Sequence, residues 1–173
     1  MESKLKPLDI KNLNDNVFSL LKDDWMLLTA GTRELFNTMT ASWGAFGMLW
    51  NKPIAIGFIR PQRYTFDIAN QTEHFTLSFF SHDYRKVLNF CGSHSGREVD
   101  KIAQTGITPV FSENSGVHFS EARLVLECKK LYVDELKPEN FFATNLIKEF
   151  YPQNDFHHFF IGEITNCLSS NIR

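Results

Sequence analysis

Residues 37–65 read NTMTASWGAFGMLWNKPIAIGFIRPQRYT, and this is the most informative part of the sequence. The segment Phe36 to Trp43 is rich in threonine and aromatic residues, which is typical of a β-strand. A second apolar run, Pro53 to Ile59, begins at a proline, where the missing N–H does least harm to a strand. It ends abruptly in the polar turn RPQRYT, residues 60–65. Two arginines, an amide and a hydroxyl therefore follow a buried strand.

The turn at residues 60–65 suits a bound phosphate, because guanidinium groups supply fixed, paired donors that match phosphate oxygens. Thr65 is a candidate N-cap for a short helix, Phe66 to Asn70, and the free N–H groups of that helix would add to the attraction for an anion. The alternative is a solvated turn whose arginines pair with carboxylates. Of the two, we expect a phosphate-binding turn. The residues around the phosphate would be Arg60, Gln62, Arg63, Tyr64 and Thr65.

The composition predicts one globular domain, residues 1–173. There are 17 Phe against 4 Tyr and 3 Trp. Such an excess suits a small barrel or a flat aromatic ligand, although core packing explains most of these residues. The formal net charge is −2 without a basic stripe, which argues against a nucleic acid partner.

Neither a membrane nor a metal is expected. No apolar run approaches the roughly 20 residues of a membrane helix, and the first ten residues lack a signal-peptide core, so we expect a cytoplasmic protein. Cys91, Cys128 and Cys167 are odd in number and form no CxxC, which indicates reduced thiols rather than a disulfide frame or a zinc site.

The remaining pattern favours a mainly β fold, a β-barrel with short helices. It lacks the regular βα alternation of a doubly wound sheet, and it has no GxGxxG and no P-loop. Gly162 is a possible bulge, and Ser95 and Gly106 are the expected start and stop signals of a helix at 97–104. Strands are predicted at 25–30, 36–43, 53–59, 74–81, 117–133 and 157–168, and helices at 66–70, 84–90, 97–104 and within 138–151.

Two further groups of residues could contact a ligand. The first is Thr40-Ala41-Ser42-Trp43, which would present hydroxyls and backbone amides to a ligand at a strand end. The alternative is an ordinary strand with a core tryptophan. The segment 91–96, CGSHSG, offers few side chains that would obstruct a ligand, or it only caps a helix. It looks like the nucleophile elbow GxSxG, but His94 replaces the central serine, so we reject a hydrolase.

The order of these motifs resembles the flavin reductase-like proteins of the FMN-binding split-barrel superfamily, and most of all the flavoredoxin-type subgroup. The resemblance spans roughly Leu28 to Ile164. It implies a Greek-key split barrel, a homodimer and FMN as cofactor. It also implies that the turn at 60–65 binds the FMN phosphate, that the loop CGSxSGR and Lys101 lie near the flavin, and that the end of strand 74–81 lies near the cofactor, partly across a subunit boundary.

The cofactor-binding set that follows is Asn37, Thr40, Ala41, Ser42, Trp43, Arg60, Gln62, Arg63, Tyr64, Thr65, Ser78, Phe79, Cys91, Gly92, Ser93, Ser95 and Lys101. No catalytic side chain is predicted, because the cofactor does the chemistry. His157 and His158 point to opposite faces of a strand and cannot chelate one metal together. One of them could face the flavin pocket, and a surface or core position is the alternative for both.

Two functions remain open. The first is an oxidoreductase that takes electrons from NADH or NADPH and passes them through FMN to a flavin, a metal complex or a protein. The second is a non-catalytic FMN electron carrier that a partner protein reduces. A small barrel for haem or another aromatic ligand ranks below both, because no histidine is singled out as an axial ligand. The sequence does not indicate the acceptor or the choice between NADH and NADPH.

Overall fold

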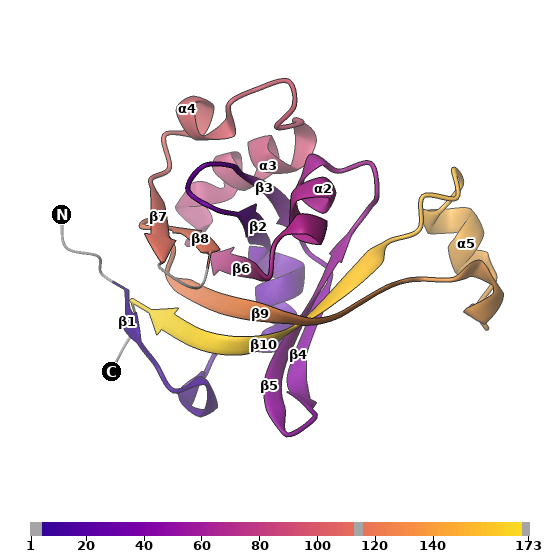
Figure 1. Cartoon of the computed structure of the whole chain (residues 1–173), viewed down its shortest axis with the longest axis horizontal. Helices are drawn as coiled ribbons and strands as arrows, with labels where there is room; N and C mark the ends of the chain where they lie inside the picture. The colour runs from indigo at the N-terminus through magenta and orange to yellow at the C-terminus, as the bar shows by residue number, and fades with distance from the viewer. Residues whose placement is uncertain (1–4, 113–115, 171–173) are drawn as a thin grey trace.

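The computed structural model describes residues 5–112 and 116–170, and its main feature is one strongly bent antiparallel sheet (Figure 1). The sheet order is β3-β2-β6-β9-β10-β5-β4, with β1 added on the free side of β10. These strands are β1 (Lys6–Pro7), β2 (Met26–Gly31), β3 (Phe36–Ala41), β4 (Gly44–Leu49), β5 (Lys52–Ile59), β6 (His74–Phe79), β9 (Leu124–Glu135) and β10 (His158–Ser169). The predicted mainly β fold is confirmed.

Short helices cover one side of the barrel, where α2, α3 and α4 lie above β2 and β3 (Figure 1). A separate hairpin, β7 (Pro109–Ser112) with β8 (Gly116–Phe119), packs beside β6. The helical elements are η1 (Ile10–Asn12), α1 (Val17–Ser19), η2 (Leu20–Asp24), α2 (Tyr64–Gln71), η3 (His82–Tyr84), α3 (Arg85–Ser93), α4 (Lys101–Thr105), η4 (Pro138–Asn140) and α5 (Asn145–Phe150).

The barrel interior is filled by apolar side chains from nearly every strand. Leu28, Leu77, Phe79 and Phe160 are essentially inaccessible to solvent and belong to one cluster. A second cluster, around Phe119, lies beneath α3. Burial of such large side chains is the main source of stability, at about 1.5–3 kcal/mol for each. The two ends of the sheet approach each other where β3 contacts β5.

Residues 136–157 connect β9 to β10 and extend away from the barrel with η4 and α5 (Figure 1). We call this segment the arm. Its base is closed by a hydrogen bond from the Leu136 N–H to the His157 carbonyl, 2.9 Å long. Its interior is aromatic, with Tyr151 stacked on Phe156 at a centroid distance of 4.7 Å. The helices predicted within 138–151 are confirmed.

Several local predictions are wrong. The strand β4 was not predicted; it pairs with β5 through a two-residue turn in which Trp50 and Asn51 both have positive φ, 51° and 58°. Glycines at 44 and 47 weaken its strand signal. The expected strand 117–133 is two strands, because a turn at 120–123 separates β8 from β9. The register shift between Ile161 and Gly162 confirms the predicted bulge.

The helix boundaries also differ around the predicted site. Arg63 is the N-cap of α2, so Thr65 lies inside the helix rather than at its cap. Cys91, Gly92 and Ser93 form the last turn of α3 instead of a loop. The helix expected over 97–104 is the shorter α4, which begins at Lys101. Its cap is the Asp100 carboxylate, which accepts from two backbone N–H groups, and Gly106 ends it as predicted.

Candidate functional site

The end of β3 and the residues that follow it form one wall of a pocket of about 210 Å³, which we call the Trp43 pocket. Trp43 itself is 43% exposed. The opposite wall comes from β5, the turn after it and His157, the last residue of the arm before β10. The lining residues are Met39, Thr40, Ala41, Ser42, Trp43, Phe58, Arg60, Arg63 and His157. Six of the predicted site residues therefore meet in one place.

Arg63 lines this pocket and has one guanidinium nitrogen without a partner among the described residues. Its Nη1 donates to the Gly92 carbonyl at 2.9 Å, and its Nη2 is buried without a hydrogen-bond partner among the described residues. An unsatisfied buried donor is costly, by about 1–3 kcal/mol or more for a charged group. Burial also lowers the pKa of Arg63 from its usual value. The site would be stabilised by an acceptor placed at Nη2.

Lys101 is a buried cation close to the half-buried Arg63. Its Nζ donates to the carbonyls of Thr38 and Cys91, both at 2.8 Å. Burial lowers the pKa of Lys101 to about 8; Cys91 acts in the opposite direction and the charge of Arg63 acts in the same one. Neither cation forms an ion pair in residues 5–112 and 116–170.

The two cations have a structural role as well, because their acceptors Cys91 and Gly92 lie at the carboxyl end of α3. Cations are favourable there, since the last carbonyls of a helix lack partners within it. This role accounts for Lys101, which is 5% exposed and holds α3 against β3. It leaves one nitrogen of Arg63 without a partner, so Arg63 is the better candidate for binding an anion.

Arg60 and Gln62 have different partners from those expected. Arg60 Nη1 forms an ion pair with Asp155 of the arm, and its Nη2 donates to the Phe150 carbonyl at 2.8 Å. Gln62 Nε2 donates to the same Asp155 oxygen at 2.7 Å. Burial raises the pKa of Asp155, but the hydrogen bonds from Arg60 and Gln62 outweigh it and lower that pKa overall. These contacts fasten the arm to the barrel, so we do not carry Arg60 and Gln62 forward as phosphate ligands.

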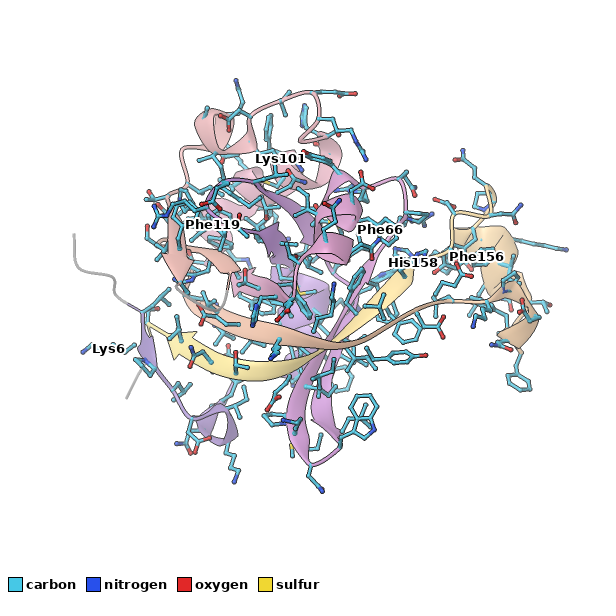
Figure 2. The ribbon with its side chains drawn as sticks, viewed as in Figure 1. Lys6, Phe66, Lys101, Phe119, Phe156 and His158 are labelled. Atoms are coloured by element: carbon cyan, nitrogen blue, oxygen red, sulfur yellow. The ribbon has the colours of Figure 1, made fainter. Side chains whose placement is uncertain are left out.

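A tight contact between β3, α2 and the residues after α3 sets the geometry beside Arg63. Asn37 Nδ2 donates to Thr65 Oγ1 at 2.8 Å, and Thr40 Oγ1 donates to the Leu88 carbonyl. A methyl group at Gly96 would collide with the Asn37 side chain. Asn37, Tyr64 and Lys101 line a second, larger hollow of about 590 Å³ on this side of β3. Figure 2 shows Lys101 on the helical side of the barrel.

Other predicted residues lie outside the pocket. Ser78, Phe79 and Cys91 are completely buried and offer no surface for a cofactor to contact, so the geometry gives their predicted role no support. Ser93 Oγ donates to the Asn89 carbonyl within α3. Ser95 Oγ accepts from the Arg97 N–H, and neither serine lines the Trp43 pocket.

His157 lines the Trp43 pocket, although the sequence did not distinguish it from His158. Its Nδ1 lies 2.9 Å from Tyr151 Oη, and its ring centroid is 5.0 Å from that of Trp43. Burial lowers the pKa of His157 to about 4; Arg60 contributes to the shift and Asp155 opposes it. The imidazole is therefore neutral at pH 7. His158 points the other way and packs on Phe66 at 4.5 Å, where the arm leaves the barrel (Figure 2).

The Trp43 pocket is therefore lined by a tryptophan and an imidazole, and two cations without an ion pair among the described residues lie at it: Arg63, which lines it, and Lys101 close to Arg63. The family follows from the sequence as a whole. A family model described as flavin reductase like domain matches residues 19–172, and the chain belongs to that family. A search of curated proteins finds no match.

Solved structures confirm the fold. An FMN-binding protein from Thermus thermophilus is similar with a TM-score of 0.66 and 19% identity, over 95% of this chain and 80% of the other. A flavoredoxin from Methanosarcina acetivorans has a TM-score of 0.66 and 22% identity, over 95% and 75%. A flavoredoxin from Desulfovibrio vulgaris (Miyazaki F) has a TM-score of 0.64 and 23% identity, over 92% and 75%. The chain therefore shares the split-barrel fold of these structures.

Two negative observations apply to the part of the chain that the structure describes. No group of three or more His, Cys, Asp or Glu side chains is placed to hold a metal ion there. No helix in that part has both the length and the apolar composition needed to span a membrane.

Proposed function

We propose that the chain binds FMN and works as an oxidoreductase of the flavin reductase type, which takes electrons from NADH or NADPH and passes them to a flavin, a metal complex or a protein. The observation that carries this proposal is the free Arg63 Nη2 beside the Trp43 pocket, in a chain of this family. A bound FMN would supply the redox chemistry, since it accepts a hydride and can return electrons singly or in pairs.

The phosphate of FMN fits the cationic end of the site. It would accept from Arg63 Nη2, and its negative charge would offset the repulsion between Arg63 and Lys101. The first turn of α2 starts at Tyr64, directly after Arg63, and its free N–H groups favour an anion at the same point. Binding a phosphate would therefore resolve an unfavourable arrangement of charges.

The flavin ring fits the neutral end of the site. Trp43 and Phe58 line the pocket with aromatic surface that the flavin ring could contact. Thr40 and Ser42 line it with hydroxyl-bearing side chains. His157 is neutral at pH 7, so it adds a hydrogen-bonding edge without adding charge. What these residues do is hold the ring in one orientation and exclude water from one of its faces, which is how a protein contributes to cofactor chemistry.

The volume of the Trp43 pocket, about 210 Å³, is below the roughly 300–1,000 Å³ of typical ligand sites. We therefore propose a homodimer in which a second subunit completes the site. Met48, Trp50 and Tyr132 are 69%, 57% and 43% exposed and offer apolar area for such an interface. Light scattering should give twice the monomer mass of 20.0 kDa. A stable monomer with full FMN affinity would contradict this proposal.

The second candidate is a non-catalytic FMN electron carrier, and the similarity to two flavoredoxins favours it. Both candidates need the same cofactor site, so only a kinetic measurement separates them. Steady-state oxidation of NADH or NADPH by the FMN-loaded protein, with free flavin as acceptor, supports the enzyme. FMN binding without reduction by either nucleotide supports the carrier.

The test of FMN binding itself is direct. Purified protein should hold one flavin per chain, which heat should release and mass spectrometry identify as FMN. Recovery of haem, or no uptake of FMN at micromolar concentration, would overturn the proposal.

A further inference from the structure

A second cavity, of about 460 Å³, lies between the arm and the barrel, and we call it the arm pocket. It shares Ser42, Trp43 and Phe58 with the Trp43 pocket, so the two pockets are neighbours. Unlike the Trp43 pocket it is almost entirely apolar. Its lining residues are Ser42, Trp43, Gly44, Phe58, Leu136, Phe141, Leu146, Phe150 and Tyr151.

The walls of the arm pocket are held by specific contacts rather than by loose chain. The Phe150 ring packs edge-on against Trp43 at 5.4 Å. Phe141 packs edge-on against Tyr151 at 6.0 Å. Arg60 donates to the Phe150 carbonyl, and its ion pair with Asp155 fixes the arm beyond it. The arm pocket is therefore a formed cavity whose volume falls within the roughly 300–1,000 Å³ of small-molecule sites.

We propose that the arm pocket binds a neutral, planar aromatic electron acceptor of the quinone class and places it beside the cofactor in the Trp43 pocket. This inference rests on the proposed FMN site. In the reaction, the quinone takes two electrons and two protons from reduced FMN and leaves as the hydroquinone, while the flavin returns to its oxidised form. NADH or NADPH supplies the electrons that reduce the flavin beforehand.

The chemistry of the walls selects this class of ligand. The aromatic rings of Trp43, Phe141 and Phe150 favour stacked and edge-on contacts with another flat ring. None of the described residues that line the arm pocket carries a charge. An anionic acceptor such as a ferric chelate would lose its hydration there without compensation. Arg60, which lies over the Tyr151 ring of this wall, is already paired with Asp155.

Two substitutions on the same arm form a matched pair. Leu146 lines the pocket and is 37% exposed, so Leu146→Asp places a charge at its wall with little effect on the core. Phe142 is fully exposed and does not line the pocket, so Phe142→Asp is the control. Leu146→Trp fills the cavity without a charge. It keeps the test valid if Leu146→Asp proves unstable.

The measurement is calorimetric titration of the oxidised protein, as purified, with menadione in the absence of a nicotinamide. Wild type and Phe142→Asp should bind equally, while Leu146→Asp and Leu146→Trp should lose affinity by about tenfold or more. FMN affinity should be the same in all four. During turnover, the KM for menadione should rise in the Leu146 variants while the reduction of ferricyanide, which needs no apolar pocket, stays at the wild-type rate.

Equal menadione affinity in all four proteins, or no binding to wild type, would overturn the inference while leaving FMN binding intact. Loss of menadione binding in Phe142→Asp together with dissociation of a dimer would also overturn it, because the cavity would then be a seat for a second copy of the chain. If the protein takes up no FMN, the proposed function itself fails, and the separate flavin titration shows this.

Discussion

The two arginines of the turn after β5 should behave differently when each is replaced by alanine. Arg63→Ala removes the one buried guanidinium nitrogen that lacks a partner among the described residues, and Arg60→Ala breaks the ion pair with Asp155. If Arg63 binds the FMN phosphate, its loss removes a charge-assisted hydrogen bond worth roughly 1.5–3 kcal/mol. At 1.4 kcal/mol per decade, FMN affinity should fall about 10- to 100-fold.

Riboflavin lacks the phosphate and is the control ligand. Arg63→Ala should leave its affinity nearly unchanged, because the ring pocket keeps its walls. Arg63→Lys should recover only part of the FMN affinity, since an ammonium cannot keep the Gly92 carbonyl and reach the phosphate with the same fixed geometry. Arg60→Ala should lower the affinities for FMN and for riboflavin by the same factor, because releasing the arm disturbs the pocket that receives the flavin ring.

The assay is titration of both flavins into wild type and the three variants, followed by the change in flavin fluorescence. Equal losses of FMN and riboflavin affinity in Arg63→Ala would refute the phosphate assignment. A selective loss of FMN affinity in Arg60→Ala would show that the phosphate displaces Asp155 from Arg60, and the division of roles between the two arginines would then be wrong.

Two further predictions concern stability. Gly162→Ala should destabilise the fold by roughly 1–3 kcal/mol in chemical denaturation, because a methyl group there would lie 2.7 Å from Phe75 and 2.8 Å from Cys128 in a filled core, and an unchanged midpoint would contradict this. The pKa of His157 is about 4 in the fold against 6.5 without it, so the unfolded chain binds the proton first as pH falls. This group stabilises the fold above pH 6.5, and that stability is lost as the pH falls toward 4, by about 2 to 3 kcal/mol at 1.36 kcal/mol per unit. The free energy of unfolding of His157→Phe should therefore fall less than that of wild type between pH 6.5 and 4. The same dependence of stability on pH in both proteins would refute the burial argument.

The parts of the fold that could be predicted from the sequence are those whose pattern lies within a few neighbouring residues. β5 carries a proline near its start, at Pro53, followed by a short apolar run, and the Gly162 bulge follows from one residue. β4 was missed because its glycines weaken the pattern and because its turn places Trp50, an unusual residue for positive φ, in the left-handed region. Glycine or asparagine there would have marked a hairpin.

The site was predictable only in part, because its electrostatics depend on distant contacts. The sequence places Arg60 and Arg63 together and makes them equivalent, but Asp155 lies on the arm and pairs with Arg60 alone. Likewise, nothing local separates His157 from His158; the difference arises because Trp43, far away in the sequence, packs against His157. Ser78 and Phe79 were placed near the cofactor by the family resemblance alone, and the sequence does not indicate that the sheet buries both completely.

The central claim is that this chain holds FMN and passes electrons through it. Its most direct test is the visible spectrum of the FMN-loaded protein, recorded without oxygen before and after adding NADH or NADPH. We predict that at least one of the two nucleotides bleaches the flavin absorption and that adding free flavin or menadione restores it. A protein that takes up no FMN, or whose bound FMN stays oxidised with both nucleotides, would contradict the enzymatic account.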